Sequence, residues 1–197
     1  MLQQPAFAED SPLQLLVPAL SQLDAYVDAL KRDWSPDNIR LGKAAAEELA
    51  RIEADPAAFL AAQDDREAKA GPIVLPDGSQ VPRLPSYRRW IWDDGFCGAV
   101  NFRWQPGTEA LPPHCLGHIG YAVVPWKRGR GYATRALARL LPEARKEGLR
   151  YVELSTDLAN VASQKVIANN GGVLVKRFHK DPAYGDVEAF LFRIDLV

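Results

Sequence analysis

One segment in the second half of the chain sets two glycines among arginines. It reads Val123-Val124-Pro125-Trp126-Lys127-Arg128-Gly129-Arg130-Gly131-Tyr132-Ala133-Thr134. An apolar run, 119–124, predicts a strand that ends at Pro125, because proline cannot donate to a sheet ladder. Apolar residues at helical spacing then begin at Ala133. Such a loop brings free backbone N–H groups and a helix N-terminus to one point, which suits it to hold phosphate oxygens.

Other loop types explain this stretch less well. An ordinary strand-to-helix turn uses glycines for their positive φ angles, but it does not require two arginines. A Walker-type loop needs Lys-Ser or Lys-Thr after its last glycine, and this stretch has neither. A dinucleotide-binding turn is closer, and Glu153 lies roughly where its ribose-binding acid is expected. Residues 125–128 nevertheless separate the strand from the glycines, whereas the dinucleotide turn is immediate.

At this point the chain resembles the GCN5-related N-acetyltransferase (GNAT) family. Arg128-Gly129-Arg130-Gly131-Tyr132-Ala133 matches the Arg/Gln-x-x-Gly-x-Gly/Ala loop with which that family binds the pyrophosphate of acetyl-CoA. A second segment, 154–163, is similar to the family's next motif, a strand followed by an Asn-x-x-Ser helix start. The resemblance covers about Tyr87 to Val197.

The resemblance implies a set of contacts with acetyl-CoA, which would serve as a co-substrate. Backbone groups of Val123 and Val124, with Val123 favoured, would face the pantetheine arm where their strand splays from the next one. The pyrophosphate would lie against Arg128, Gly129, Arg130, Gly131, Tyr132 and Ala133, and Asn160 and Ser163 would face the pantetheine. Two simpler roles stay open on the residues alone. Asn160 is a good helix N-cap, and the Tyr132 ring can pack beneath the loop.

The rest of the chain predicts helices first and strands afterwards. Residues up to about Ala70 have helical periodicity, and 87–92 and 96–104 predict a hairpin. A strand at 151–155, a helix from 161 and a final hairpin of 173–178 with 187–194 follow. This order predicts an α+β fold with a mixed, mostly antiparallel sheet flanked by helices, as the GNAT resemblance implies. We expect a helical N-terminal extension, 1–70, packed as one structural unit on an acetyl-CoA-binding domain, 71–197.

Composition excludes several classes of protein. The chain has 197 residues, 47% of them hydrophobic, and this suits one soluble globular domain. A net charge of -1 gives no positive field to attract a nucleic acid. Two cysteines are too few for a disulfide framework or a metal site, so we expect no metal. The chain begins without a secretory signal and has no apolar run that could cross a bilayer, which predicts a cytoplasmic protein without a membrane partner.

The resemblance implies an enzyme that transfers an acetyl group directly to a primary amine of a small molecule or a protein. A homodimer is left open. An alkylammonium must lose a proton before attack, and two residues are placed to take it, His118 and Glu153. We favour His118, because the reference pKa of histidine, about 6.5, makes it the readier base. Simpler roles are a histidine bonded at the sheet edge and an exposed strand carboxylate.

One departure from the family keeps a second function open. Members often carry a tyrosine acid in the helix after the Asn-x-x-Ser segment, but Val166 and Ile167 occupy the middle of that helix here. The leaving thiolate would then take its proton from water or from Tyr184. The alternative function is a non-catalytic acyl-CoA-binding module that senses CoA or scaffolds a partner.

Overall fold

The structure is a computed structural model and describes residues 13–75, 78–184 and 186–196. The helices are α1 (Leu20–Lys31), α2 (Leu41–Ala54), α3 (Pro56–Ala61), α4 (Tyr132–Lys146) and α5 (Val161–Ala168), with 3-10 turns η1 (Pro125–Lys127) and η2 (Pro182–Tyr184). The strands are β1 (Gln14–Leu16), β2 (Asp64–Asp65), β3 (Ile73–Val74), β4 (Gln80–Val81), β5 (Ser86–Trp92), β6 (Phe96–Arg103), β7 (Ile119–Val123), β8 (Tyr151–Asp157), β9 (Val173–His179) and β10 (Glu188–Asp195).

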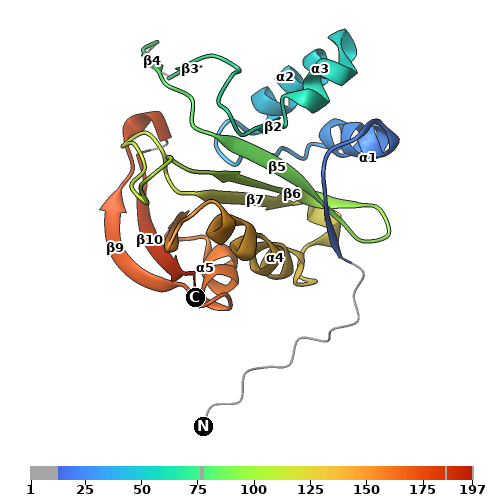
Figure 1. The fold of residues 1–197 in the computed structure, drawn as a ribbon. Coiled ribbons are helices and arrows are strands. Elements are labelled where there is room, and N and C mark those ends of the chain that lie inside the picture. The colour runs from blue at the N-terminus through green and yellow to red at the C-terminus, as the bar shows by residue number, and fades with distance from the viewer. Residues whose placement is uncertain (1–12, 76–77, 185, 197) are drawn as a thin grey trace.

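Two antiparallel sheets form the centre of the molecule (Figure 1). The larger has the strand order β1–β5–β6–β7, with β2 also paired to β5, and the smaller has the order β8–β10–β9. Strands β5 and β6 form the first predicted hairpin, and β9 and β10 form the last. Between β7 and β8 the described residues show one isolated bridge, Gly117 to Leu154, instead of a ladder. The predicted α+β architecture is confirmed.

Helices cover both faces of the larger sheet, with α1–α3 on one side and α4 and α5 on the other (Figure 1). Both faces of strand β5 carry large apolar side chains, since successive side chains of a strand point to opposite faces. Tyr87 packs with Leu137 and Leu140 of α4. On the other face of the same strand, Trp90 stacks on Tyr26 of α1 with ring centroids 4.7 Å apart. The sheet is therefore buried on both sides, with β7 at one edge.

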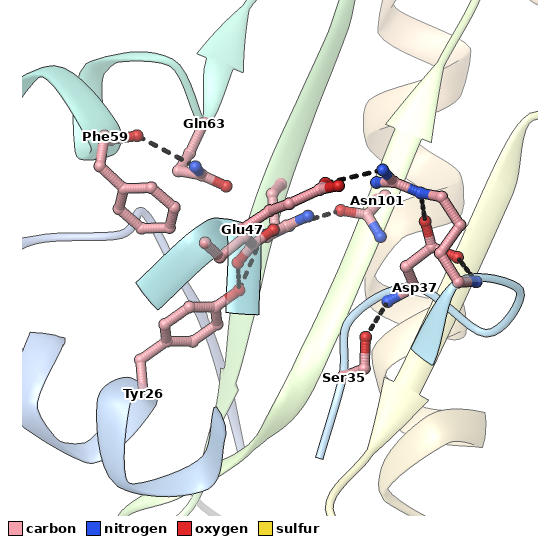
Figure 2. A network of polar contacts seen from close by, with 10 residues as sticks. Tyr26, Ser35, Asp37, Glu47, Phe59, Gln63 and Asn101 are labelled. Carbon is pink, nitrogen blue, oxygen red and sulfur yellow. Dashed lines mark hydrogen bonds and ion pairs between the residues drawn. The ribbon is translucent and has the colours of Figure 1, made fainter. Parts of the chain in front are cut away.

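A buried polar network fastens α1 and α2 to the β5–β6 hairpin (Figure 2). The Arg88 side chain is 16% exposed; its Nη1 donates to Glu48 Oε1 at 2.9 Å and to the Tyr26 hydroxyl at 2.8 Å. Its Nε donates to Asn101 Oδ1 at 2.8 Å. The Tyr26 hydroxyl also donates to the Glu48 carboxylate, and burial raises the pKa of Tyr26 well above its ordinary value. The buried charge thus has a counter-ion and hydrogen-bond partners, as burial requires.

Two features of the N-terminal part differ from the helical expectation. Strand β1 pairs with β5 from Gln14↔Trp92 to Leu16↔Trp90, so the N-terminal part contributes an edge strand to the larger sheet. Strand β2 adds a second short pairing to β5. Strands of two or three residues are too short to produce an alternating pattern, and this is why the sequence does not reveal them.

In the C-terminal half, strand β8 runs on to Asp157, past its predicted end at Ser155.

Candidate active site

A pocket opens where β7 and β8 separate. The strands touch at their starts, where the His118 N–H donates to the Glu153 carbonyl at 2.7 Å. Beyond this contact they enclose a cavity of about 310 Å³. Its walls come from β7, β8, α5, the α1–α2 connection and the β9–β10 loop. This is the gap that the family resemblance predicts.

Alternate residues of β7 turn their backbone groups toward this gap. On the β6 side, the Val124 N–H donates to Cys97 O at 3.0 Å and the His118 carbonyl accepts from Arg103 N at 2.9 Å. In an antiparallel ladder, the residues between such pairs face the other way. Two of the carbonyls in this row accept hydrogen bonds from side chains. Asn38 Nδ2 donates to Tyr121 O at 3.1 Å, and Arg128 Nε donates to Val123 O at 3.2 Å.

The two valines therefore differ. Val123 lies in the row that faces the gap, and its contact with the pantetheine arm stays a prediction. The N–H of Val124 is engaged by Cys97, and its carbonyl accepts from Lys127 N at 3.0 Å. Its side chain is fully buried. A backbone contact between Val124 and a ligand would have to displace one of these bonds.

The glycine loop has the backbone that its sequence predicts. Gly129 and Gly131 have φ angles of 76° and 75°, in the left-handed region that disfavours other residues. A Cβ at either position would meet nothing within 4 Å, so open space lies over both. Gly131 is the N-cap of α4 and makes no side-chain capping bond. The first N–H groups of α4 therefore remain available to an anion.

The side chains around this loop have different roles. Arg130 is exposed, and its carbonyl accepts from Arg135 Nη2 at 3.4 Å. Tyr132 is 7% exposed and packs with Ile91 and Ala136 beneath the loop. The ring of Tyr132 is thus part of the core, as the simpler interpretation expected, and its N–H is the group left for a ligand.

Asn160 and Ser163 meet at the start of α5. Asn160 Oδ1 accepts from the Ser163 N–H at 3.1 Å, so Asn160 is the N-cap of this helix. Both residues also line the pocket. The capping role is therefore present, and it places the two side chains where a ligand in the gap would pass.

The two predicted bases lie beside the contact between the strands, and both are engaged. His118 is fully buried; its Nδ1 accepts from the Glu153 N–H at 3.0 Å, and burial lowers its pKa. The neutral ring then carries its proton on Nε2, which has no partner among the described residues. The Glu153 carboxylate is 21% exposed and accepts from Arg193 Nη2 at 2.8 Å.

The fold brings to the pocket several polar side chains that the sequence did not indicate. They are Asn38 from the α1–α2 connection, Ser155, Thr156 and Asp157 from β8, and Lys180 from the β9–β10 loop. Lys180 is 9% exposed and forms an ion pair with Asp157. Tyr184, which the sequence left open with water as a proton source, also lines the pocket, and its hydroxyl donates to His114 O at 2.8 Å. Asn38 and Lys180 belong to no short motif. Ser155, Thr156 and Asp157 lie within the 154–163 segment, but its Asn-x-x-Ser pattern marks only Asn160 and Ser163.

Two absences hold for the part of the chain that the structure describes. No group of three or more histidine, cysteine, aspartate or glutamate side chains is arranged to hold a metal ion there. No helix there is long and apolar enough to cross a membrane.

The fold is similar to solved acetyltransferase structures. One is the microcin C7 self-immunity acetyltransferase MccE in complex with acetyl-CoA and AMP, with 15% identity, 95% of this chain and 93% of that chain covered, and a TM-score of 0.62. Another is the ribosomal L7/L12 alpha-N-protein acetyltransferase RimL in complex with coenzyme A, with 15% identity, 95% of each chain covered and a TM-score of 0.60. A third, from Salmonella typhimurium, modifies the N-terminal serine of L7/L12, with 15% identity, coverages of 94% and 95%, and a TM-score of 0.61. A search of curated protein sequences gave no match.

The sequence matches the model of the acetyltransferase (GNAT) domain over residues 40–173. The match begins just before α2 and ends at the first residue of β9, so it includes the glycine loop, both strands of the pocket and α5. It covers more than half of the chain, and the fold agrees with it. The chain therefore belongs to the GNAT family of acetyltransferases.

Proposed function

We propose that the protein transfers the acetyl group of acetyl-CoA to the nitrogen of a primary amine. The pantetheine arm lies in the pocket between β7 and β8, beside Val123, Asn160 and Ser163. The pyrophosphate lies against the backbone of residues 128–133. The observation that carries this proposal is the separation of β7 from β8, followed by the uncapped N-terminus of α4.

Three features support the fit of acetyl-CoA. The loop leaves open space over Gly129 and Gly131, so phosphate oxygens can approach its backbone. Arg128 and Arg130 add positive charge beside the N–H groups. Thr156 lines the pocket at 5% exposure, and its hydroxyl oxygen is buried without a partner among the described residues. A buried polar atom of this kind is satisfied when a polar ligand fills the gap.

The acceptor is a primary amine of a small molecule or a protein. It enters at the end of the pocket formed by the α1–α2 connection and the β9–β10 loop. One structural neighbour is named as an alpha-N-protein acetyltransferase, and another was solved with acetyl-CoA and AMP. The acceptors to test therefore include peptides with a free N-terminus as well as small amines.

Removal of the proton from the amine requires a base with a free lone pair. His118 is the first base to test, but the lone pair on its Nδ1 is held by the Glu153 N–H. A base role for His118 requires this bond to open. His118→Asn tests it, because the amide oxygen can still accept the Glu153 N–H while the variant has no titrating ring. A large loss of turnover at unchanged CoA affinity would support His118; parent-like turnover at every pH would transfer the role to Glu153 or to water.

The proposal is tested by incubating the purified protein with acetyl-CoA and a panel of amines while free thiol is measured. We expect amine-dependent thiol release, with the acetylated amine detected by mass spectrometry. CoA binding by calorimetry without thiol release from any amine would indicate the non-catalytic acyl-CoA-binding module instead. Absence of CoA binding would contradict both functions.

A further inference from the structure

The proposed reaction leaves a thiolate that needs a proton, and few groups around the pocket can give one. Hydroxyls of serine and threonine and the amides of asparagine are poor acids. The Tyr121 hydroxyl donates to Ser163 O at 3.4 Å, and burial raises the pKa of Tyr121 to about 12. The Tyr184 hydroxyl already donates to His114 O, and burial raises its pKa as well. Both tyrosines are therefore held and weakened as acids.

Lys180 differs from all of these groups because it is the one cation among the described residues that line the pocket. It follows β9 directly, and its N–H donates to Val187 O at 3.0 Å, which anchors it where β9 passes into the loop. Its side chain reaches back to the end of β8 and pairs with Asp157. The residue is 9% exposed, whereas the Asp157 side chain is 48% exposed. The ammonium thus lies on the inner side of the pair.

We propose that Lys180 is the proton donor to the leaving thiolate of CoA. This inference rests on the acetyl transfer proposed above and deepens it. Asp157 positions the ammonium and balances its charge. An ammonium has three donor protons, and among the described residues Asp157 is the partner of one of them, so another can be given to a group in the pocket.

The step balances in atoms and electrons. The amine nitrogen forms a bond to the thioester carbon, and the carbon–sulfur bond breaks with its electron pair left on sulfur. Sulfur takes a proton from Lys180 Nζ, and the neutral Lys180 amine then takes the proton that the new amide nitrogen releases. The products are the acetylated amine and the free thiol of CoA, with Lys180 again an ammonium.

The test compares Lys180→Arg with Lys180→Met. Arginine keeps the charge and can keep the pair with Asp157, but a guanidinium does not give up its proton. With acetyl-CoA and the accepted amine, we expect both variants to lose roughly 100-fold or more in kcat, the usual range for general acid catalysis. Lys180→Arg should keep the melting temperature of the parent, its affinity for CoA and its KM for acetyl-CoA. A solely structural role would leave Lys180→Arg active.

A second thioester separates the effect of proton donation from other effects of the substitution. Phenyl thioacetate releases a thiophenolate, which is a stable enough anion to leave without protonation. We expect Lys180→Arg and the parent to acetylate the amine from phenyl thioacetate at rates within a few-fold of each other. A parent-like kcat of Lys180→Arg with acetyl-CoA would overturn the inference, as would an equal loss with both thioesters. A loss in Tyr184→Phe that phenyl thioacetate restores, with Lys180→Arg active, would assign the proton to Tyr184. Absence of thiol release from the parent would instead contradict the proposed function itself.

Discussion

The glycine loop at 128–133 and the far end of the β7–β8 pocket are built in opposite ways. The loop consists of consecutive residues, and its character comes from the backbone: two positive φ angles, open space over both glycines and an uncapped helix start. The far end consists of side chains that are distant in sequence: Asn38 from the α1–α2 connection, Asp157 from the end of β8 and Lys180 from the β9–β10 loop. A loop of the first kind can be recognised from a motif. A site of the second kind exists only once the chain has folded.

The largest effect should follow from breaking the buried ion pair between Arg88 and Glu48, which fastens α1 and α2, and with them their connection, to the larger sheet. Arg88→Met leaves Glu48 buried without its counter-ion, and breaking such a pair costs about 3–5 kcal/mol. We expect urea denaturation to show a loss of this size in the free energy of unfolding. Lys146→Met is the control, since its pair with Glu143 is exposed, at 71% and 43%, and such pairs contribute at most about 1 kcal/mol. Equal losses in both variants would contradict the role of burial.

The next effect concerns the loop itself. Gly131→Val places a side chain in the space where the pyrophosphate is proposed to lie, and we expect CoA affinity to fall about 100-fold, equivalent to about 3 kcal/mol, through lost charge-assisted hydrogen bonds. Gly148→Val is a matched control at the other end of α4, because both glycines have positive φ and open space around them. Both variants should lose similar stability through backbone strain. Calorimetry that finds equal CoA affinities would remove the phosphate role from the loop.

A smaller effect concerns the point at which the two strands meet. Burial lowers the pKa of His118 in the folded state, so as pH falls below about 6.5 the unfolded chain takes up a proton that the folded chain does not. The free energy of unfolding should then decrease by at most about 1.4 kcal/mol per pH unit toward acid pH. His118→Asn should show a smaller decrease between pH 7 and pH 5 in urea denaturation. Parallel pH dependences would mean that this ring contributes nothing to acid sensitivity.

The smallest effect separates the cap from the ligand contact at Asn160. Asn160→Ala removes the bond to the Ser163 N–H and should cost about 1 kcal/mol of stability. Asn160→Ser keeps a capping oxygen, so its melting temperature should stay near that of the parent. If Asn160 also contacts the ligand, Asn160→Ser lowers acetyl-CoA affinity or turnover. Parent-like values of both would leave Asn160 a cap alone.

Much of the fold could be predicted, because its long elements carry their own periodicity. The β5–β6 and β9–β10 hairpins and α4 lie close to where alternation, turn residues and helical spacing place them. Strands β1 and β2 could not be predicted, because two or three residues carry no period and their pairing depends on β5. The engagement of His118 could not be predicted either. Its Nδ1 contact joins residues 35 positions apart, which only the meeting of β7 with β8 creates.

The glycine loop, the Asn160 cap and the order of the longer elements follow from the amino-acid sequence, because each depends on neighbouring residues and on local backbone preferences. The tertiary structure alone decided which side chains face the pocket. It turned the N–H of Val124 toward β6, packed the Tyr132 ring into the core and brought Lys180 to Asp157 across a gap of 23 residues. The physical reason is that side chains meet through sheet register and burial, which depend on the fold as a whole.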